Sequence, residues 1–187
     1  MKVGILEIST LPSRNLFEKA YNVVYNKQIT SITPQAISVW CRQLGHETFY
    51  ATYYGRGNIQ NLLPKDLDLV FIACTTYVSA LAYAVAKLYR KAGVQTVVGG
   101  AHAKAFPADC LRFFDLVVKE CDKNLIADIL NGHFDPGSYI SSAQPCDDFP
   151  SVEERATEIR ATALIMKRWY TPFPFTVVPV MTSTGCP

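Results

Sequence analysis

The sequence predicts an α/β protein built on a doubly wound, five-stranded parallel sheet of the Rossmann or flavodoxin-like kind. Short apolar runs rich in Val, Ile and Phe alternate over residues 1–132 with segments whose apolar residues recur at helical spacing. Two of these runs lead directly into small or polar residues, as strands do at the ligand-binding edge of an open sheet. Hydrophobic residues make up 49% of the chain and charged residues 18%, which is typical of a well-packed globular domain.

Composition excludes several classes of partner. The formal net charge is +2 and no basic run is present, so nothing indicates nucleic-acid binding. No apolar stretch approaches the roughly 18 residues that a membrane span needs. The start, MKVGILEIST, has no signal-peptide pattern. We therefore expect a cytoplasmic protein with neither nucleic-acid nor membrane partners.

Six scattered cysteines contain no C-x-x-C pair, and in such a chain they are expected to be reduced thiols. We expect the first five to be packed as small hydrophobic side chains. The six are Cys41, Cys74, Cys110, Cys121, Cys146 and Cys186.

The first part of the sheet is predicted from residues 3–53. A buried strand covers residues 3–8, and a long connection over 9–33 is expected to hold a short helix or a lid. Thr33 as N-cap and Pro34 at the first helical position begin a helix that Gly45 ends. Residues 47–53 form the second strand.

The central prediction is a strand, helix and strand between Leu67 and His102. Residues 67–73 are a buried strand, and 94–98 are another. The helix between them ends at Gly93. Its inner face is expected to consist of the apolar residues at spacings of three and four. These are Ala80, Leu81, Ala84, Val85 and Leu88.

The remaining elements complete the predicted domain organisation. A helix opens at Phe106-Pro107, residues 115–119 form the fifth strand, and residues 125–130 form a helix. Loss of periodicity and gain of Pro, Gly and Ser after residue 132 predict a linker over 133–175 with a helical segment in it. Residues 176–187 are then expected to be the first strand of a second domain.

No catalytic group stands out, so the domain is expected to bind a ligand and not to catalyse by itself. No histidine has metal-ligand spacing, and neither a nucleophile elbow nor a phosphate-binding loop is present. Gly99 and Gly100 would let a bulky ligand approach the backbone. Thr75 and Thr76 could donate hydrogen bonds to it, or could instead cap the following helix. His102 could contact it too, or could be a turn histidine bonded to backbone.

Three segments carry a resemblance to a known family. They are the run AGVQTVVGGAH at 92–102, the segment FDLVVKE at 114–120 and the terminal TSTGCP. With these segments the chain resembles the N-terminal part of cobalamin-dependent radical S-adenosylmethionine (SAM) enzymes. In that family a Rossmann-like cobalamin-binding domain precedes a radical SAM barrel.

The resemblance implies a set of site residues. Gly99, Gly100, Ala101 and His102 would lie beside the cobalamin nucleotide tail, with Thr75, Thr76 and Tyr77 at the neighbouring strand end. Glu120 stands in Lys119-Glu120-Cys121-Asp122, where the family usually has Gly-Glu-Gly-Glu. The connection over 9–33 contains no histidine to bind cobalt, so Leu11 is expected to face the lower side of the metal. Cys186 would be the first ligand of a [4Fe–4S] motif that is incomplete here.

The resemblance also implies a function for a longer chain. Such an enzyme would methylate an unactivated carbon of a small-molecule substrate, with SAM as radical source and cobalamin as methyl carrier. The cluster and SAM would bind only a longer chain, and this chain alone is expected to be inactive. The alternative is a non-catalytic flavodoxin-like module that binds another nucleotide-like ligand or a protein partner.

Overall fold

The computed structural model describes residues 1–9, 14–18, 20, 31–53, 55, 57–143 and 149–162 of the 187-residue chain. Most of the predicted connection over 9–33 lies outside the described residues. So do Leu11, Cys146, Cys186 and the predicted strand over 176–181. Of the described helices, none is long and apolar enough to cross a membrane.

The described strands form one parallel sheet in the order β2-β1-β3-β4-β5-β6. The first five follow the flavodoxin-like order, which confirms the predicted fold class. The strands are β1 Lys2–Ile8, β2 Glu47–Tyr53, β3 Leu69–Ala73, β4 Gln95–Gly99, β5 Leu116–Val118 and β6 Ser138–Ile140.

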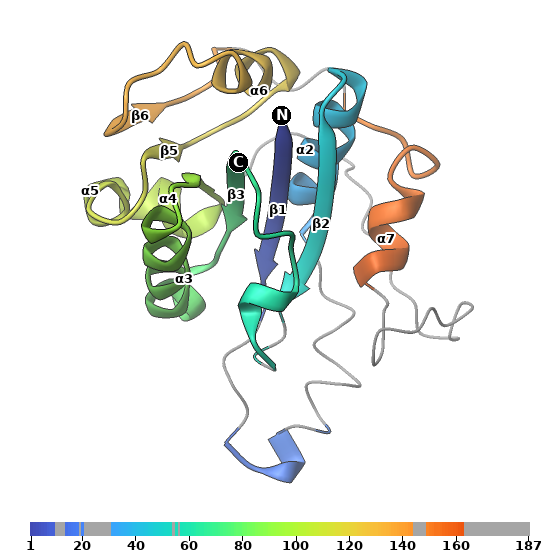
Figure 1. Cartoon of the computed structure of the whole chain (residues 1–187), viewed down its shortest axis with the longest axis vertical. Helices are drawn as coiled ribbons and strands as arrows, with labels where there is room; N and C mark the ends of the chain where they lie inside the picture. Colours follow the sequence, from blue (N-terminus) through green and yellow to red (C-terminus); the bar gives the residue numbers. More distant parts are fainter. Residues whose placement is uncertain are drawn as a thin grey trace.

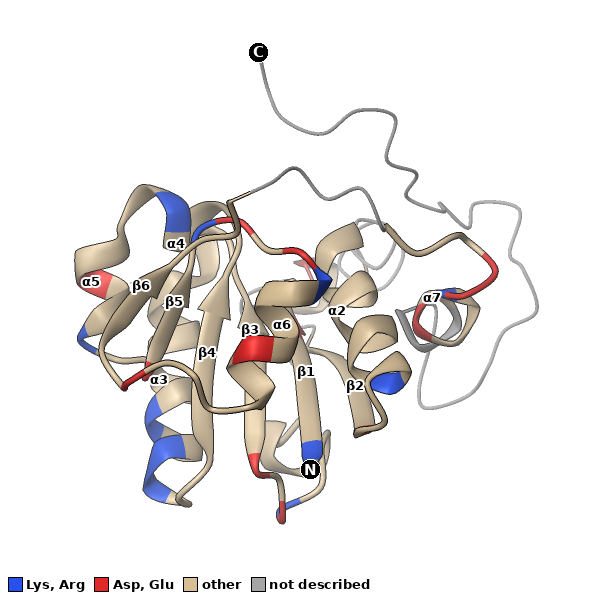
Figure 2. Ribbon diagram, turned by 90° about the horizontal axis from the view of Figure 1, so that it is seen from above, with Lys and Arg blue, Asp and Glu red and all other residues tan. Residues whose placement is uncertain are grey.

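Helices cover both faces of this sheet, and the two layers are separated in Figures 1 and 2. One face carries α2 and α6, whose apolar residues pack with those of β1, β3, β4 and β5. The other face carries α3, α4 and α5. The helices are α2 Ile32–Gln43, α3 Ser79–Lys91, α4 Ala101–Ala105, α5 Pro107–Leu111, α6 Lys123–Leu130 and α7 Ala156–Thr162, with short 3₁₀ turns η2 Ile59–Asn61 and η3 Thr76–Val78.

The sixth strand corrects the predicted strand count. Residues 138–140 of the predicted linker pair with Leu116, Val117 and Val118 of β5. Only three residues long and not apolar throughout, β6 gives no strand signal in the sequence. It pairs with β5 because the backbone N–H and C=O groups on that edge of β5 would otherwise lack hydrogen-bond partners.

Two helical predictions need correction. The described α2 begins at Ile32 after Ser31, so Thr33 and Pro34 lie inside its first turn and Thr33 is not the N-cap. The buried residues of α3 are Ala82, Val85 and Ala86, and Leu81 is partly buried against the core, whereas Leu88 is 42% exposed. Small residues occupy both faces of α3. The spacing of its apolar residues therefore predicted the wrong buried positions for most of the helix.

Cysteine packing agrees with the sequence for the described thiols. Cys41, Cys74 and Cys110 are buried and Cys121 is half-buried, and all four are thiols that form no disulfide bond. They fill space in the two apolar layers that enclose the sheet.

Candidate functional site

A cavity of about 720 Å³ opens at the carboxyl edge of the sheet. Its walls include the ends of β1, β3, β4 and β5, together with residues of α2 and α6. Since β2 lies on one side of β1 and β3 on the other, the cavity stands at the point where the strand order reverses. Ligands of open α/β sheets bind at this point, and the volume falls within the range of about 300–1,000 Å³ for small-molecule sites.

Two small residues side by side on neighbouring strands make room for the cavity. Glu7 of β1 lies opposite Ala73 of β3, and Ala73 lies opposite Gly99 of β4. All three line the cavity. An ideal Cβ at Gly99 would meet only the Val118 carbonyl oxygen, at 3.9 Å, among heavy atoms within 4 Å. Ala73 and Gly99 therefore leave a space that larger side chains would fill.

An apolar floor lies one layer deeper on the same face of the sheet. Ile5, Phe71 and Val97 are adjacent in the strand register and each is buried. All three also line the cavity. A ligand group that enters past Ala73 and Gly99 would thus meet hydrocarbon beneath it, which favours an apolar or aromatic group.

Gly100 makes the turn from β4 into α4. Its φ is +103°, and a Cβ there would lie 3.0 Å from the Cys74 carbonyl oxygen. Gly100 is therefore required by the backbone itself, whether or not a ligand is present. Of the pair, only Gly99 could take a Cβ with no more than an ordinary van der Waals contact, to the Val118 carbonyl oxygen.

The structure brings five of the predicted site residues to the cavity. They are Thr75, Gly99, Gly100, Ala101 and Glu120. Thr76, Tyr77 and His102 are not among its lining residues, and the Tyr77 side chain is 69% exposed. The alternative of capping is also not seen, because the Thr75 side chain makes no cap hydrogen bond.

His102 belongs to a separate polar cluster on the α3 face. Its Nε2 lies 2.6 Å from the Tyr83 hydroxyl, and its Nδ1 lies 3.3 Å from Thr76 Oγ1. The residue is 4% exposed, and burial lowers the pKa of its imidazole, against a smaller opposing effect of Asp109. His102 thus joins α4 to α3 and η3 through side chains, whereas the alternative reading expected a backbone partner.

Glu7 is a buried acid on the cavity wall that the sequence analysis did not select. It is 3% exposed. Oε1 accepts a hydrogen bond from the Ser31 backbone N–H at 2.6 Å, and Oε2 accepts one from the Tyr50 hydroxyl at 3.0 Å. Burial raises the pKa of this carboxyl, while the hydrogen bonds oppose the rise. The signal was available, since Glu7 interrupts an otherwise apolar buried strand.

Aromatic side chains close the cavity opposite the sheet. Trp40 of α2 and Phe149 both line it, and their rings meet edge to face with centroids 6.0 Å apart. At the opening, Lys104 forms an ion pair with Glu120, and both of these cavity residues are more than half exposed. The cavity is thus aromatic inside and charged at its rim.

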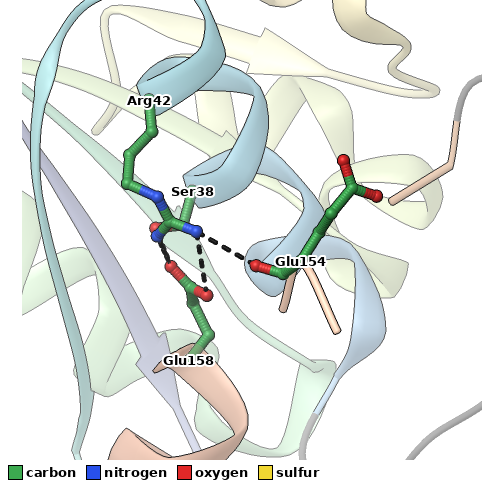
Figure 3. Close-up of polar contacts among 4 residues, drawn as sticks. All are labelled: Ser38, Arg42, Glu154 and Glu158. Atoms are coloured by element: carbon green, nitrogen blue, oxygen red, sulfur yellow. Dashed lines mark hydrogen bonds and ion pairs between the residues drawn. The ribbon is translucent and has the colours of Figure 1, made fainter. Parts of the chain in front are cut away.

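A polar cluster connects α2 to the segment around α7 (Figure 3). Glu158, 1% exposed, accepts a hydrogen bond from Ser38 at 2.8 Å and pairs with Arg42. The Arg42 guanidinium also donates to the Glu154 carbonyl at 3.2 Å.

Arg155 adds a second connection between the same two segments. It is 2% exposed and donates to Gln35 Oε1 at 2.7 Å and to the Pro150 carbonyl at 3.1 Å. These contacts fix residues 149–158 against the back of α2, whose other side faces the cavity.

The cavity offers binding groups more readily than catalytic ones. Burial raises the pKa of the Cys74 thiol to about 12, so this cavity residue stays protonated and is a poor nucleophile at neutral pH. Within the described ranges, no three His, Cys, Asp or Glu side chains come together as a metal site.

Fold and site together define the chain as an open α/β protein with a cavity at the strand-order reversal. Comparison of the sequence with family models and curated proteins, and of the fold with solved structures, found no significant match.

Proposed function

We propose that this chain is a cobalamin-binding domain and that the cavity receives the nucleotide tail of the cofactor. The observation that carries the proposal is the cavity itself, which lies at the strand-order reversal and exists because Ala73 and Gly99 are small. The resemblance of Gly99, Gly100 and His102 to the family's Gly-Gly-x-His is the reason to propose cobalamin over other nucleotide-like ligands.

The residues present fit such a tail. An aromatic base would lie on the apolar floor, beside the Trp40 and Phe149 rings. At the opening, the ammonium of Lys104 is available to an anionic phosphate, which would compete with Glu120 for it.

When bound, cobalamin supplies a carrier for a methyl group. The residues of this chain would bind and orient the tail, and we infer no chemical step for them. A radical SAM methyltransferase activity, acting on a small-molecule substrate, is proposed only for a longer chain that holds the cluster. We place this function in the cytoplasm, where reduced cysteines persist.

The test is a titration with hydroxocobalamin followed by desalting and a visible spectrum. The wild-type chain should retain a stoichiometric amount. Gly99→Val should weaken retention by about tenfold or more, because its side chain fills the cavity at a cost of about 1–3 kcal/mol. Gly99→Ala, which adds less bulk at the same position, should have a smaller effect.

Ala84→Val serves as a control, since it adds bulk at an exposed position of α3 away from the cavity. It should bind as the wild type does. If neither this chain nor one extended beyond Cys186 retains cobalamin, the proposal is wrong. A flavodoxin-like module with another nucleotide-like ligand or a protein partner would then be the better account.

A further inference from the structure

Glu7 places an acidic group beside the apolar floor of the cavity. Ala73 lies next to Glu7 in the strand register, and Gly99 lies next to Ala73. Neither residue has a polar side-chain atom that could bond to the carboxyl. The carboxyl is fixed in position, because the Ser31 backbone N–H holds one oxygen and the Tyr50 hydroxyl the other. A fixed polar group on an apolar wall is the usual means by which a small-molecule site orients its ligand.

The environment of this carboxyl favours its neutral form. The side chain is 3% exposed, and neither of its two hydrogen-bond partners among the described residues carries a positive charge. Burial disfavours the charged form and raises the pKa of this carboxyl, whereas the hydrogen bonds from Ser31 and Tyr50 act in the opposite direction. A neutral carboxyl is both a hydrogen-bond acceptor and an O–H donor.

We propose that Glu7 is the specificity-determining residue of the cavity and donates a hydrogen bond to a ring nitrogen of an aromatic heterocycle bound there. The ligand class is therefore a heterocycle with a pyridine-type nitrogen, whose lone pair accepts the proton. A carboxylate or phosphate at this depth is disfavoured, because the site has no cation to pair with it among the described contacts of Glu7. This inference rests on the proposed function only in placing the ligand in the cavity.

Two fragments of nearly equal shape separate this contact from simple apolar packing. Benzimidazole has a pyridine-type nitrogen and indole does not. Their dissociation constants for the full chain are measured by NMR titration of isotope-labelled protein at neutral pH. The wild type should prefer benzimidazole by about tenfold, the value of one hydrogen bond of about 1.4 kcal/mol.

Variants at position 7 assign the preference to the carboxyl. Glu7→Gln keeps an N–H donor and should keep the preference, whereas Glu7→Met has similar bulk without a donor and should bind both fragments equally. Tyr50→Phe removes a partner of Glu7 but leaves the carboxyl, and should keep the preference.

Three results would overturn the inference: no preference in the wild type, no binding of either fragment, or a preference that survives in Glu7→Met. The wild-type comparison needs no variant, so a Met variant that failed to fold would leave the test intact. Hydroxocobalamin titrated into the same samples keeps the two proposals apart. Cobalamin binding without a fragment preference rejects the role of Glu7 alone. A fragment preference, with no cobalamin retained by this chain or by the extended chain, rejects the cofactor alone.

Discussion

Gly99 and Gly100 are adjacent in the chain but differ in what a side chain there would meet. A Cβ at Gly99 would make only an ordinary van der Waals contact, and one at Gly100 would lie too close to the Cys74 backbone. A large substitution at Gly100 would therefore impair binding by disturbing the backbone, even if no ligand approached it. Gly99 is the position at which a loss of binding can be attributed to the cavity.

Gly100→Ala is expected to lower the free energy of unfolding by about 1–3 kcal/mol, because alanine is strained at φ +103°. Gly99→Ala should leave it within about 1 kcal/mol of the wild type. Urea unfolding of the two variants without ligand makes the comparison. Equal losses at the two positions would contradict the described turn.

Glu7 should make stability depend on pH. Burial raises the pKa of the Glu7 carboxyl in the folded chain. The unfolded chain therefore releases the carboxyl proton at about pH 4.3, whereas the folded chain retains it to higher pH. The contribution of this group to stability is full below that pH and is lost as pH rises through the folded-state pKa. Glu7→Gln has no proton to release.

The stability of Glu7→Gln relative to the wild type should therefore increase between about pH 4 and pH 7. Unfolding free energies from urea titrations over that range give the difference directly. If the unfolding free energies of the two proteins vary with pH in parallel, the pKa of Glu7 is the same in the folded and unfolded states. That result would contradict the expected effect of burial.

At the scale of elements, α2 is held from two sides. Pro34, Ile37 and Trp40 face the cavity, whereas Gln35, Ser38 and Arg42 contact the segment around α7. The packing of residues 149–158 against α2 therefore positions the wall of the cavity as well as Phe149.

Arg42→Met should destabilise the chain by about 1–3 kcal/mol, because it removes the guanidinium that pairs with the buried Glu158 carboxylate. Glu158→Gln should cost less, since the amide oxygen can still accept from Ser38. A double-mutant cycle measured by urea unfolding gives the coupling between the two positions. Additive effects would mean that the pair contributes no net stability.

At the scale of the whole molecule, the sheet has a protected centre and two edges. Among the described strands, β1, β3, β4 and β5 have hydrogen-bonded neighbours on both sides, whereas β2 and the short β6 form the edges. Local opening is easiest where strands are short and paired on one side.

Amide hydrogen exchange should accordingly be slowest in β1, β3 and β4 and markedly faster in β6. Mass spectrometry of exchanged peptides covering residues 67–75 and 136–143 tests this order. Equal protection of β6 and β3 would indicate that a further element covers the β6 edge.

The sequence determined the elements whose signals are local. Apolar runs identified the first five strands and their flavodoxin-like order, and residues Thr75, Gly99, Gly100, Ala101 and Glu120 were expected at the ligand edge, where they line the cavity. Strand patterns succeed because buried parallel strands need continuous hydrocarbon on both faces.

Only the tertiary structure decided features that depend on partners far away in the chain. β6 forms because β5 offers a free edge, and Glu158 is buried because α2 supplies Ser38 and Arg42. The His102 side chain contacts Tyr83 and does not line the cavity. Glu7 lines the cavity because Ala73 and Gly99 leave space beside β1. Contacts between residues far apart in the chain determine which polar side chains line the cavity. The local sequence pattern says little about those contacts.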